Sequence, residues 1–134
     1  SKKHVNKKWP FYKDLISKVK LVFKNEYAVL LAPGPNEVNE AKDLNTKIVL
    51  VEDQPLDIKS LISLIYFSKF IISNDTGPAH IASHFNKKGL VLFGSHTSAK
   101  KVSIENSNFK VMSVKNLKNL SVDTVVKEIK NNLN

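Results

Sequence analysis

Residues 70–82 read FIISNDTGPAHIA, and this stretch decides the fold. The apolar residues 70–73 are typical of a short buried strand, and the polar residues that follow end it. Gly77 permits either close approach of a ligand to the backbone or a positive φ, and Pro78 fits the first turn of a helix. A strand that turns at once into a helix is the building unit of parallel α/β sheets, so the stretch predicts a sheet of this kind.

The same alternation of strand and helix extends on both sides of this unit. Apolar runs predict further strands at 27–32, 47–51, 89–93 and 109–114. Amphipathic patterns and capping residues predict a helix of about four turns from Pro10 and further helices at 36–44, 57–68, 76–85 and 121–133. The sequence therefore predicts an α/β fold with a Rossmann-like parallel sheet flanked by helices, in which ligands bind at the carboxyl ends of the strands.

Length and composition favour one folded domain. The chain has 134 residues, of which 42% are hydrophobic and 25% charged, as in ordinary globular domains. It has no long uncharged apolar run, and its lysine-rich start has no apolar signal core, so we expect a cytoplasmic protein that does not span a membrane. Cysteine is absent, which excludes disulfides, thiol nucleophiles and cysteine-bound zinc.

The formal charge of +9 comes from lysine alone, because all 21 basic residues are Lys. The charge is +7 over residues 1–25, −2 over 26–99 and +4 over 100–134. Such a basic rim attracts phosphates of nucleotides, nucleic acids or lipids. Base-specific readout of nucleic acid usually relies on arginine and stacking aromatics, so we expect no nucleic-acid partner.

The chain opens without a strand. Residues 1–6 (SKKHVN) are polar, whereas a doubly wound domain normally opens with a central strand whose following loop reaches the ligand. We therefore expect residues 1–134 to form a single domain that is the C-terminal part of a longer protein and begins just after that strand.

The turn after residue 73 has the properties of an anion site. Free N–H groups and the helix dipole favour negative charge at a helix N-terminus, and Thr76 adds a hydroxyl, so a diphosphate is a natural ligand. Alternatively, Asp75 and Thr76 only cap the helix. Asp-Thr-Gly is also the catalytic triplet of aspartic proteases, but those proteins are all-β and pair two aspartates.

Two histidines follow the turn at helical spacing. His80 and His84 stand at i and i+4, where they could bind a metal, yet the glutamate of a zinc-protease helix and a third ligand are missing. We therefore predict no metal site. His84 is interpreted as a surface residue, and His80 as a residue that faces the ligand from the first turn.

These motifs resemble glycosyltransferase family nine, the ADP-heptose:lipopolysaccharide heptosyltransferases. The family's Asp-Thr-Gly-Pro-x-His-x-Ala signature is matched from Asp75 to Ala82. Lys7-Lys8-Trp9-Pro10 is similar to its Lys-x-Trp-Pro, and Gly34-Pro35-Asn36-Glu37 is similar to its Gly-rich turn and glutamate. The order and spacing of these motifs agree, and the resemblance runs from about Lys7 to Met112.

The resemblance implies a GT-B enzyme of two Rossmann-like domains, of which this chain is the C-terminal, donor-binding one. The implied roles are phosphate contact for Lys7, with Lys8 as the other candidate, ribose hydroxyls for Glu37, and diphosphate for Thr76 and Gly77. It further implies that Asp75 and His80 lie near the phosphates or the donor sugar. No cofactor is implied, and no catalytic residue is assigned to this chain, because the general base and the acceptor site belong to the N-terminal domain.

The implied function is transfer of heptose from ADP-heptose to the lipopolysaccharide inner core, inverting and independent of metal, at the inner face of the inner membrane. One departure is that Ser95-His96-Thr97-Ser98 replaces the proline that usually follows Gly94, which leaves base and sugar preference open. Two alternatives remain: the same fold with another nucleotide sugar, and a non-catalytic basic module that binds an anionic polymer or membrane surface.

Overall fold

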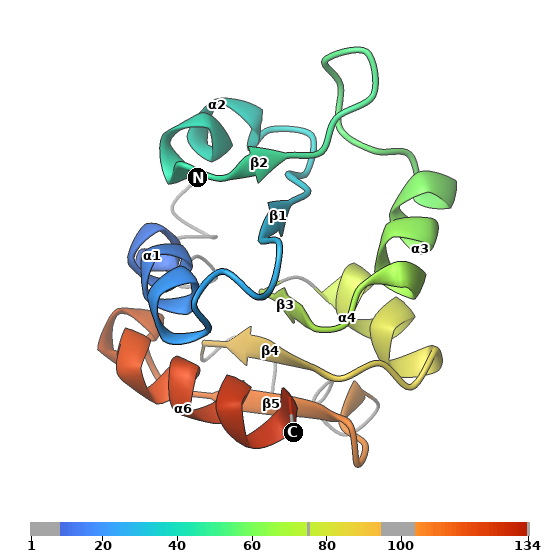
Figure 1. Cartoon of the computed structure of the whole chain (residues 1–134). Helices are drawn as coiled ribbons and strands as arrows, with labels where there is room; N and C mark the ends of the chain where they lie inside the picture. The colour runs from blue at the N-terminus through green and yellow to red at the C-terminus, as the bar shows by residue number, and fades with distance from the viewer. Residues whose placement is uncertain (1–8, 75, 95–103, 134) are drawn as a thin grey trace.

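The computed structural model of the protein describes residues 9–74, 76–94 and 104–133, without the side chain of Thr76. Parallel strands form the centre, and helices cover both faces (Figure 1). This arrangement confirms the predicted α/β fold.

The elements in chain order are α1 (Tyr12–Val22), β1 (Leu30–Leu31), α2 (Val38–Ala41), the 3-10 helix η2 (Lys42–Leu44), β2 (Lys47–Ile48), α3 (Ile58–Phe67), β3 (Ile71–Ser73), α4 (Thr76–His84), β4 (Gly89–Phe93), β5 (Phe109–Ser113), the 3-10 helix η3 (Leu117–Asn119) and α6 (Val122–Leu133).

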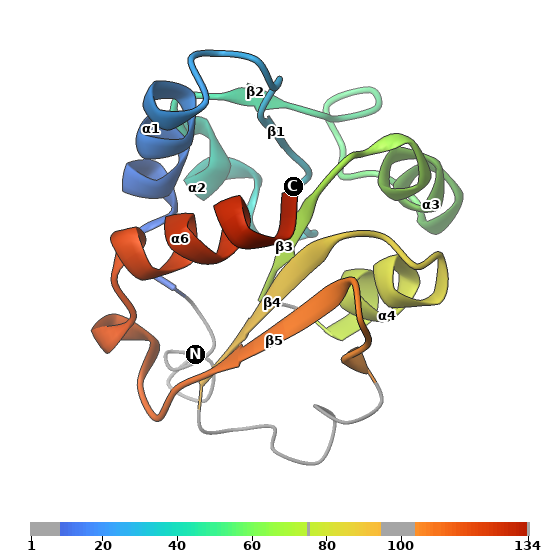
Figure 2. The same ribbon diagram turned by 60° about the horizontal axis from the view of Figure 1, so that its bottom comes forward.

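The central sheet is built around β4. Its order is β3-β4-β5, and both pairings are parallel. All five residues of β4 are buried, and successive side chains point to opposite faces of a strand. Helices α1 and α6 cover one face of this sheet, and α3 and α4 cover the other (Figure 2). β4 therefore contributes to two hydrophobic cores, one on each face.

Each core takes alternate residues of β4. Leu90 and Leu92 belong to the core under α1 and α6, where the buried partners include Leu15, Val125 and Ile129. Val91 and Phe93 belong to the core under α3 and α4, with Ile65, Ala79, Ala82, Ile104 and Phe109. An apolar residue at every position of 89–93 is thus explained by a strand that is covered on both sides.

The first two strands differ from the prediction. They are shorter than the expected runs 27–32 and 47–51, and they pair only with each other, in parallel. Positive φ angles turn the backbone just before and after this pair. They occur at Lys24 and Asn25 before β1, and at Glu52 and Asp53 within the tight antiparallel bridge from Val51 to Gln54.

The predicted helices form, with shifted ends. Asp57 caps α3 by accepting a hydrogen bond from Ser60 N at 2.8 Å, and Ser121 Oγ accepts one from Thr124 N at 3.1 Å. Both predicted caps are confirmed. The first helix begins at Tyr12, two residues after Pro10. The helix predicted at 36–44 divides into α2 and η2, and it ends at Asn45 in the left-handed conformation.

Candidate functional site

A cleft of about 410 Å³ lies where β1 and β3 end. Its lining includes the first turn of α1, the loop after β1, α2, the loop before α3, and the segment that joins β3 to α4. Ligands of open parallel sheets bind at the carboxyl ends of the strands. The cleft therefore lies where the sequence predicted a binding site.

Glu37 lies at the edge of the cleft, in a turn closed by two hydrogen bonds with Gly34. Glu37 N donates to Gly34 O, and Gly34 N donates to Glu37 Oε1, each at 3.1 Å. A Cβ at Gly34 would stand only 2.6 Å from that Oε1. Glu37 precedes α2, but its side chain makes no capping hydrogen bond there. The turn thus holds the carboxylate beside the cleft instead of at the helix end.

Tyr12 and Asn74 join α1 to the end of β3 inside the cleft. The Tyr12 hydroxyl donates to Asn74 Oδ1, and Asn74 Nδ2 donates to Leu92 O at 3.3 Å. These two contacts set the orientation of the Asn74 amide. Burial of the phenol, and secondly the charge of Glu37, raise the pKa of Tyr12 above its ordinary value. The hydroxyl therefore stays protonated and remains a donor.

Trp9 fixes the start of the same segment. Its indole Nε1 donates to Leu120 O at 2.9 Å, and its ring packs edge-on against Tyr12, with centroids 5.1 Å apart. Trp9 is 3% exposed, so burial adds to these contacts. The chain that leads into α1 is thereby anchored beside the cleft.

The predicted phosphate turn is partly described. Thr76 begins α4 and Gly77 lies exposed in its first turn. Gly77 does not have a positive φ, so the prediction that glycine is needed there for a left-handed backbone is wrong. A Cβ at Gly77 would meet no protein atom within 4 Å, so the packing of the domain itself does not require glycine there, and close approach of a ligand stays a prediction. Lys7, Lys8 and Asp75 lie outside the described residues.

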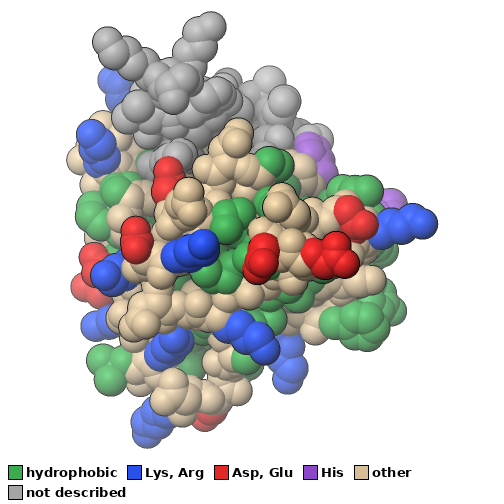
Figure 3. All heavy atoms as spheres, turned by 90° about the horizontal axis from the view of Figure 1, so that it is seen from above, with side chains coloured by type: hydrophobic (Ala, Val, Ile, Leu, Met, Phe, Trp, Pro, Cys, Tyr) green, Lys and Arg blue, Asp and Glu red, His purple; other side chains and the backbone are tan. Residues whose placement is uncertain are grey.

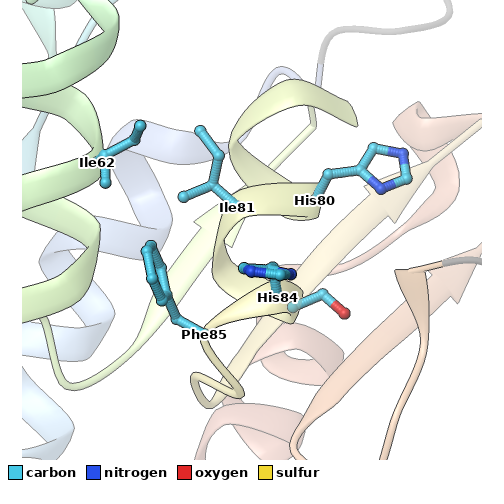
Figure 4. A pocket seen from close by; sticks show the side chains of 6 residues that line it. Ile62, His80, Ile81, His84 and Phe85 are labelled. Carbon is cyan, nitrogen blue, oxygen red and sulfur yellow. The ribbon is translucent and has the colours of Figure 1, made fainter.

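His80 is not among the residues that line the cleft. It is exposed, and with His84 it lines a separate pocket of about 470 Å³ along α4, to which Ile62 of α3 also contributes. Figure 4 shows Ile81 and Phe85 directed toward Ile62 of α3, whereas His80 points away from α3. The predicted surface position of His84 is confirmed. Within the described residues, no group of three His, Cys, Asp or Glu side chains could hold a metal ion.

The charges around the cleft are unlike those of the whole chain. Among the described residues that line it, the charged ones are Glu37 and Glu40, and none is a lysine. Figure 3 shows acidic side chains in a band across the side formed by α2, β2 and the loop after β2, with lysines mainly toward its left and lower parts. Carboxylates suit sugar hydroxyls, whereas a diphosphate needs the N-terminus of α4 and added cations.

Two cleft residues were missed from the sequence. Asn74 directly follows a predicted strand, so its place at a carboxyl end could have identified it. Tyr12 offers no comparable signal, because its partner lies 62 residues away and the contact exists only after folding.

The fold and the cleft define a Rossmann-like α/β domain: a parallel sheet with a cleft at its carboxyl edge, next to the N-terminus of a helix. The model of glycosyltransferase family 9 (heptosyltransferase) matches residues 1–130, and the chain belongs to this family. A search of curated proteins finds no match.

Solved heptosyltransferases have the same fold. E. coli heptosyltransferase WaaC with ADP aligns with a TM-score of 0.80 and 19% identity, over 95% of this chain and 40% of that one. E. coli ADP-heptose lps heptosyltransferase II aligns with a TM-score of 0.74 and 21% identity, over 96% and 43%. The chain thus spans about two fifths of the length of these proteins, and it corresponds to part of a GT-B structure. In the described residues, no helix is long and apolar enough to cross a membrane.

Proposed function

We propose that this chain is the donor-binding domain of an enzyme that transfers a heptose from ADP-heptose to a sugar of the lipopolysaccharide inner core. The observation that carries the proposal is the family match over residues 1–130, in a domain whose cleft lies at the carboxyl ends of its strands. The same cleft position holds nucleotides in other Rossmann-type domains. E. coli WaaC, which has this fold, has been solved with ADP and with ADP-2-deoxy-2-fluoro heptose.

In this proposal the nucleotide lies along the cleft with its ribose toward Glu37. A carboxylate held by the turn at Gly34 accepts hydrogen bonds from ribose hydroxyls, and Oε1 already points back to that turn. The diphosphate lies at the N-terminus of α4, against Thr76 and the open backbone at Gly77.

Three further contacts complete the proposed donor site. Lys7 supplies a cation to the diphosphate, with Lys8 as the other candidate, and Asp75 lies beside the phosphates. His80 points away from α3 (Figure 4) and does not line the cleft, and we assign it, as the family resemblance implies, to the phosphates or the donor sugar.

The chemistry proposed for the domain is stabilisation of the leaving group. As the glycosidic bond breaks, negative charge develops on the departing diphosphate. The α4 dipole, Thr76 and Lys7 offset that charge, a role that a divalent cation takes in other transferases. The general base and the acceptor site belong to a further, N-terminal domain. We place the reaction in the cytoplasm, at the inner face of the inner membrane.

A second candidate keeps the fold and changes the donor. Ser95-His96-Thr97-Ser98 departs from the usual family sequence after Gly94, and a loop there helps to select base and sugar. This alternative predicts tightest binding of a nucleotide other than ADP.

A nucleotide panel tests the proposal. ADP, UDP, GDP and CDP are titrated into the chain and followed by calorimetry and protein-observed NMR, each with and without EDTA. We expect ADP to bind most tightly and EDTA to change nothing, because lysine and the helix N-terminus supply the positive charge. Unchanged spectra of a folded sample at millimolar ADP would contradict the proposal. Equal, strongly salt-dependent binding of all four would instead support a basic module.

A further inference from the structure

One wall of the cleft is a helical segment that carries two carboxylates. Glu37, Glu40, Ala41 and Leu44 all line the cleft, and their spacing of three or four residues places them on one face of α2 and η2. Glu40 thus lies one turn after Glu37 on the same wall. Lys42, the one cation between 37 and 44, does not line the cleft. The wall that faces the ligand is therefore negative, although the chain as a whole carries +9.

The charge of this wall acts inside the cleft. The other polar side chains of the described lining include those of Tyr12, Ser73 and Asn74, and all three are neutral. After burial of the phenol, the negative charge of Glu37 is the second cause that raises the pKa of Tyr12. The phenol therefore stays protonated, and it neither adds to the charge of the wall nor offsets it.

The carboxylate of Glu37 is held in place, so an added negative group cannot simply displace it. Gly34 N donates to Glu37 Oε1 at 3.1 Å, and Glu37 N donates to Gly34 O at the same distance. A group placed against the wall must therefore offer hydrogen-bond donors. A ribose hydroxyl does so, whereas a phosphate ester brings only acceptors and between one and two negative charges. Like charges in a cleft are screened less than in open solvent.

We propose that Glu40, together with Glu37, makes the cleft selective for nucleotides whose two ribose hydroxyls are free, and excludes by charge those with a phosphate at the 2′ or 3′ position. The inference rests on the proposed function, in which the ribose lies toward Glu37. Dinucleotide-binding domains show the same chemistry, since a carboxylate accepts a free 2′-hydroxyl and an arginine accommodates a 2′-phosphate. Cofactors with a phosphorylated ribose share the adenosine diphosphate group with the proposed donor, and the wall prevents them from competing for the cleft.

The test is calorimetric titration of the 134-residue chain with ADP, 2′-phospho-ADP and 3′-phospho-ADP at low and high salt. We expect at least one phosphorylated ligand to bind about tenfold more weakly than ADP, and the difference to shrink at high salt. Glu40→Gln keeps the size of the side chain and removes its charge. That ligand should bind this variant about fivefold more tightly than the unmodified chain, a gain that misfolding cannot produce.

Glu26→Gln is the matched control. It removes the same charge from an exposed residue that precedes β1, at the end of the strand away from the cleft. We expect it to leave the ratio of the affinities for ADP and the phosphorylated ligand unchanged.

Three results would overturn the inference while leaving the proposed function intact. The first is equal binding of ADP and both phosphorylated ligands by the unmodified chain. The second is an unchanged ratio in Glu40→Gln, which would mean that shape and not charge excludes the phosphate. The third is an equal gain in Glu26→Gln, which would assign the effect to net charge. Failure of ADP itself to bind would instead contradict the proposed function, and the inference with it.

Discussion

At the scale of single residues, the cleft depends on a contact between its two sides. Tyr12 reaches from α1 to Asn74 at the end of β3, and its environment includes the charge of Glu37. The phenol is thus placed between the carboxylate proposed for ribose and the segment that leads into the phosphate turn. Its hydroxyl positions Asn74 and is not itself proposed to contact the nucleotide.

Tyr12→Phe removes this hydrogen bond and keeps the ring. Because the Asn74 amide loses one of its two fixed contacts, we expect ADP affinity to fall by about 1 kcal/mol, measured by calorimetry. Tyr27→Phe is the control: it removes a phenol hydroxyl from a residue that does not line the cleft. An equal loss in both variants would contradict a positioning role for Tyr12.

Substitutions at the two glycines of the proposed site distinguish recognition of the ribose from recognition of the diphosphate. A Cβ at Gly34 meets Glu37 Oε1, whereas one at Gly77 meets no protein atom. Gly34→Ala should displace the carboxylate and weaken adenosine and ADP alike, by about 1 kcal/mol. Gly77→Ala should spare adenosine and weaken ADP, because the methyl group enters the space proposed for the diphosphate. Parallel calorimetric titrations with both ligands check this, and an identical pattern in the two variants would refute the assignment.

At the scale of elements, β4 is the strand on which both cores depend. It begins at Gly89, where the neighbouring strands β3 and β5 approach closely. A Cβ at Gly89 would stand 2.5 Å from both Ile71 O and the Phe109 ring. One of these contacts is backbone of the paired strand β3, which cannot move away without disturbing the sheet.

Gly89→Ala should therefore destabilise the domain by about 1–3 kcal/mol, the range for overpacking a core. Urea unfolding followed by circular dichroism measures the change. Gly77→Ala serves again as the control, because its methyl group meets no protein atom. A Gly89→Ala variant as stable as this control would show that the sheet relaxes more easily than its packing indicates.

At the scale of the whole molecule, the cleft occupies one edge of the sheet. The carboxyl ends of the strands face the cleft, and the exposed rings of Tyr66 and Phe67 lie near the other edge. The described part of the site proposed for the leaving diphosphate, the N-terminus of α4, lies on one side of a single domain. An inverting transfer also needs a base on the opposite face of the sugar, and Asp75 is adjacent in sequence to the phosphate turn.

We therefore expect no measurable sugar transfer by this chain alone, and recovery of activity when an N-terminal Rossmann-like domain with an acidic residue is supplied. Release of ADP from ADP-heptose in the presence of acceptor measures both. Robust transfer by the 134 residues, abolished by Asp75→Asn, would place the base in this domain instead.

The sequence alone determined the fold class, most elements and the region of the site. Those features depend on local rules: the continuous apolar run 89–93 requires a strand covered on both sides, Asp57 and Ser121 cap the helices that they precede, and residues after 73 must lie at a strand end. The family signature around Asp75 added the interpretation that the domain binds a nucleotide sugar, and the family match supports this interpretation.

Only the tertiary structure decided the details that depend on distant partners. The Tyr12–Asn74 bond joins residues 62 positions apart, and the ring of Phe67 is left in water while that of Phe109 is buried, although both sit in apolar runs. Likewise, a Cβ would meet no protein atom at Gly77, whereas at Gly89 it would collide with Ile71 O and the Phe109 ring. Periodicity specifies which face of an element is apolar, but packing decides what, if anything, covers that face.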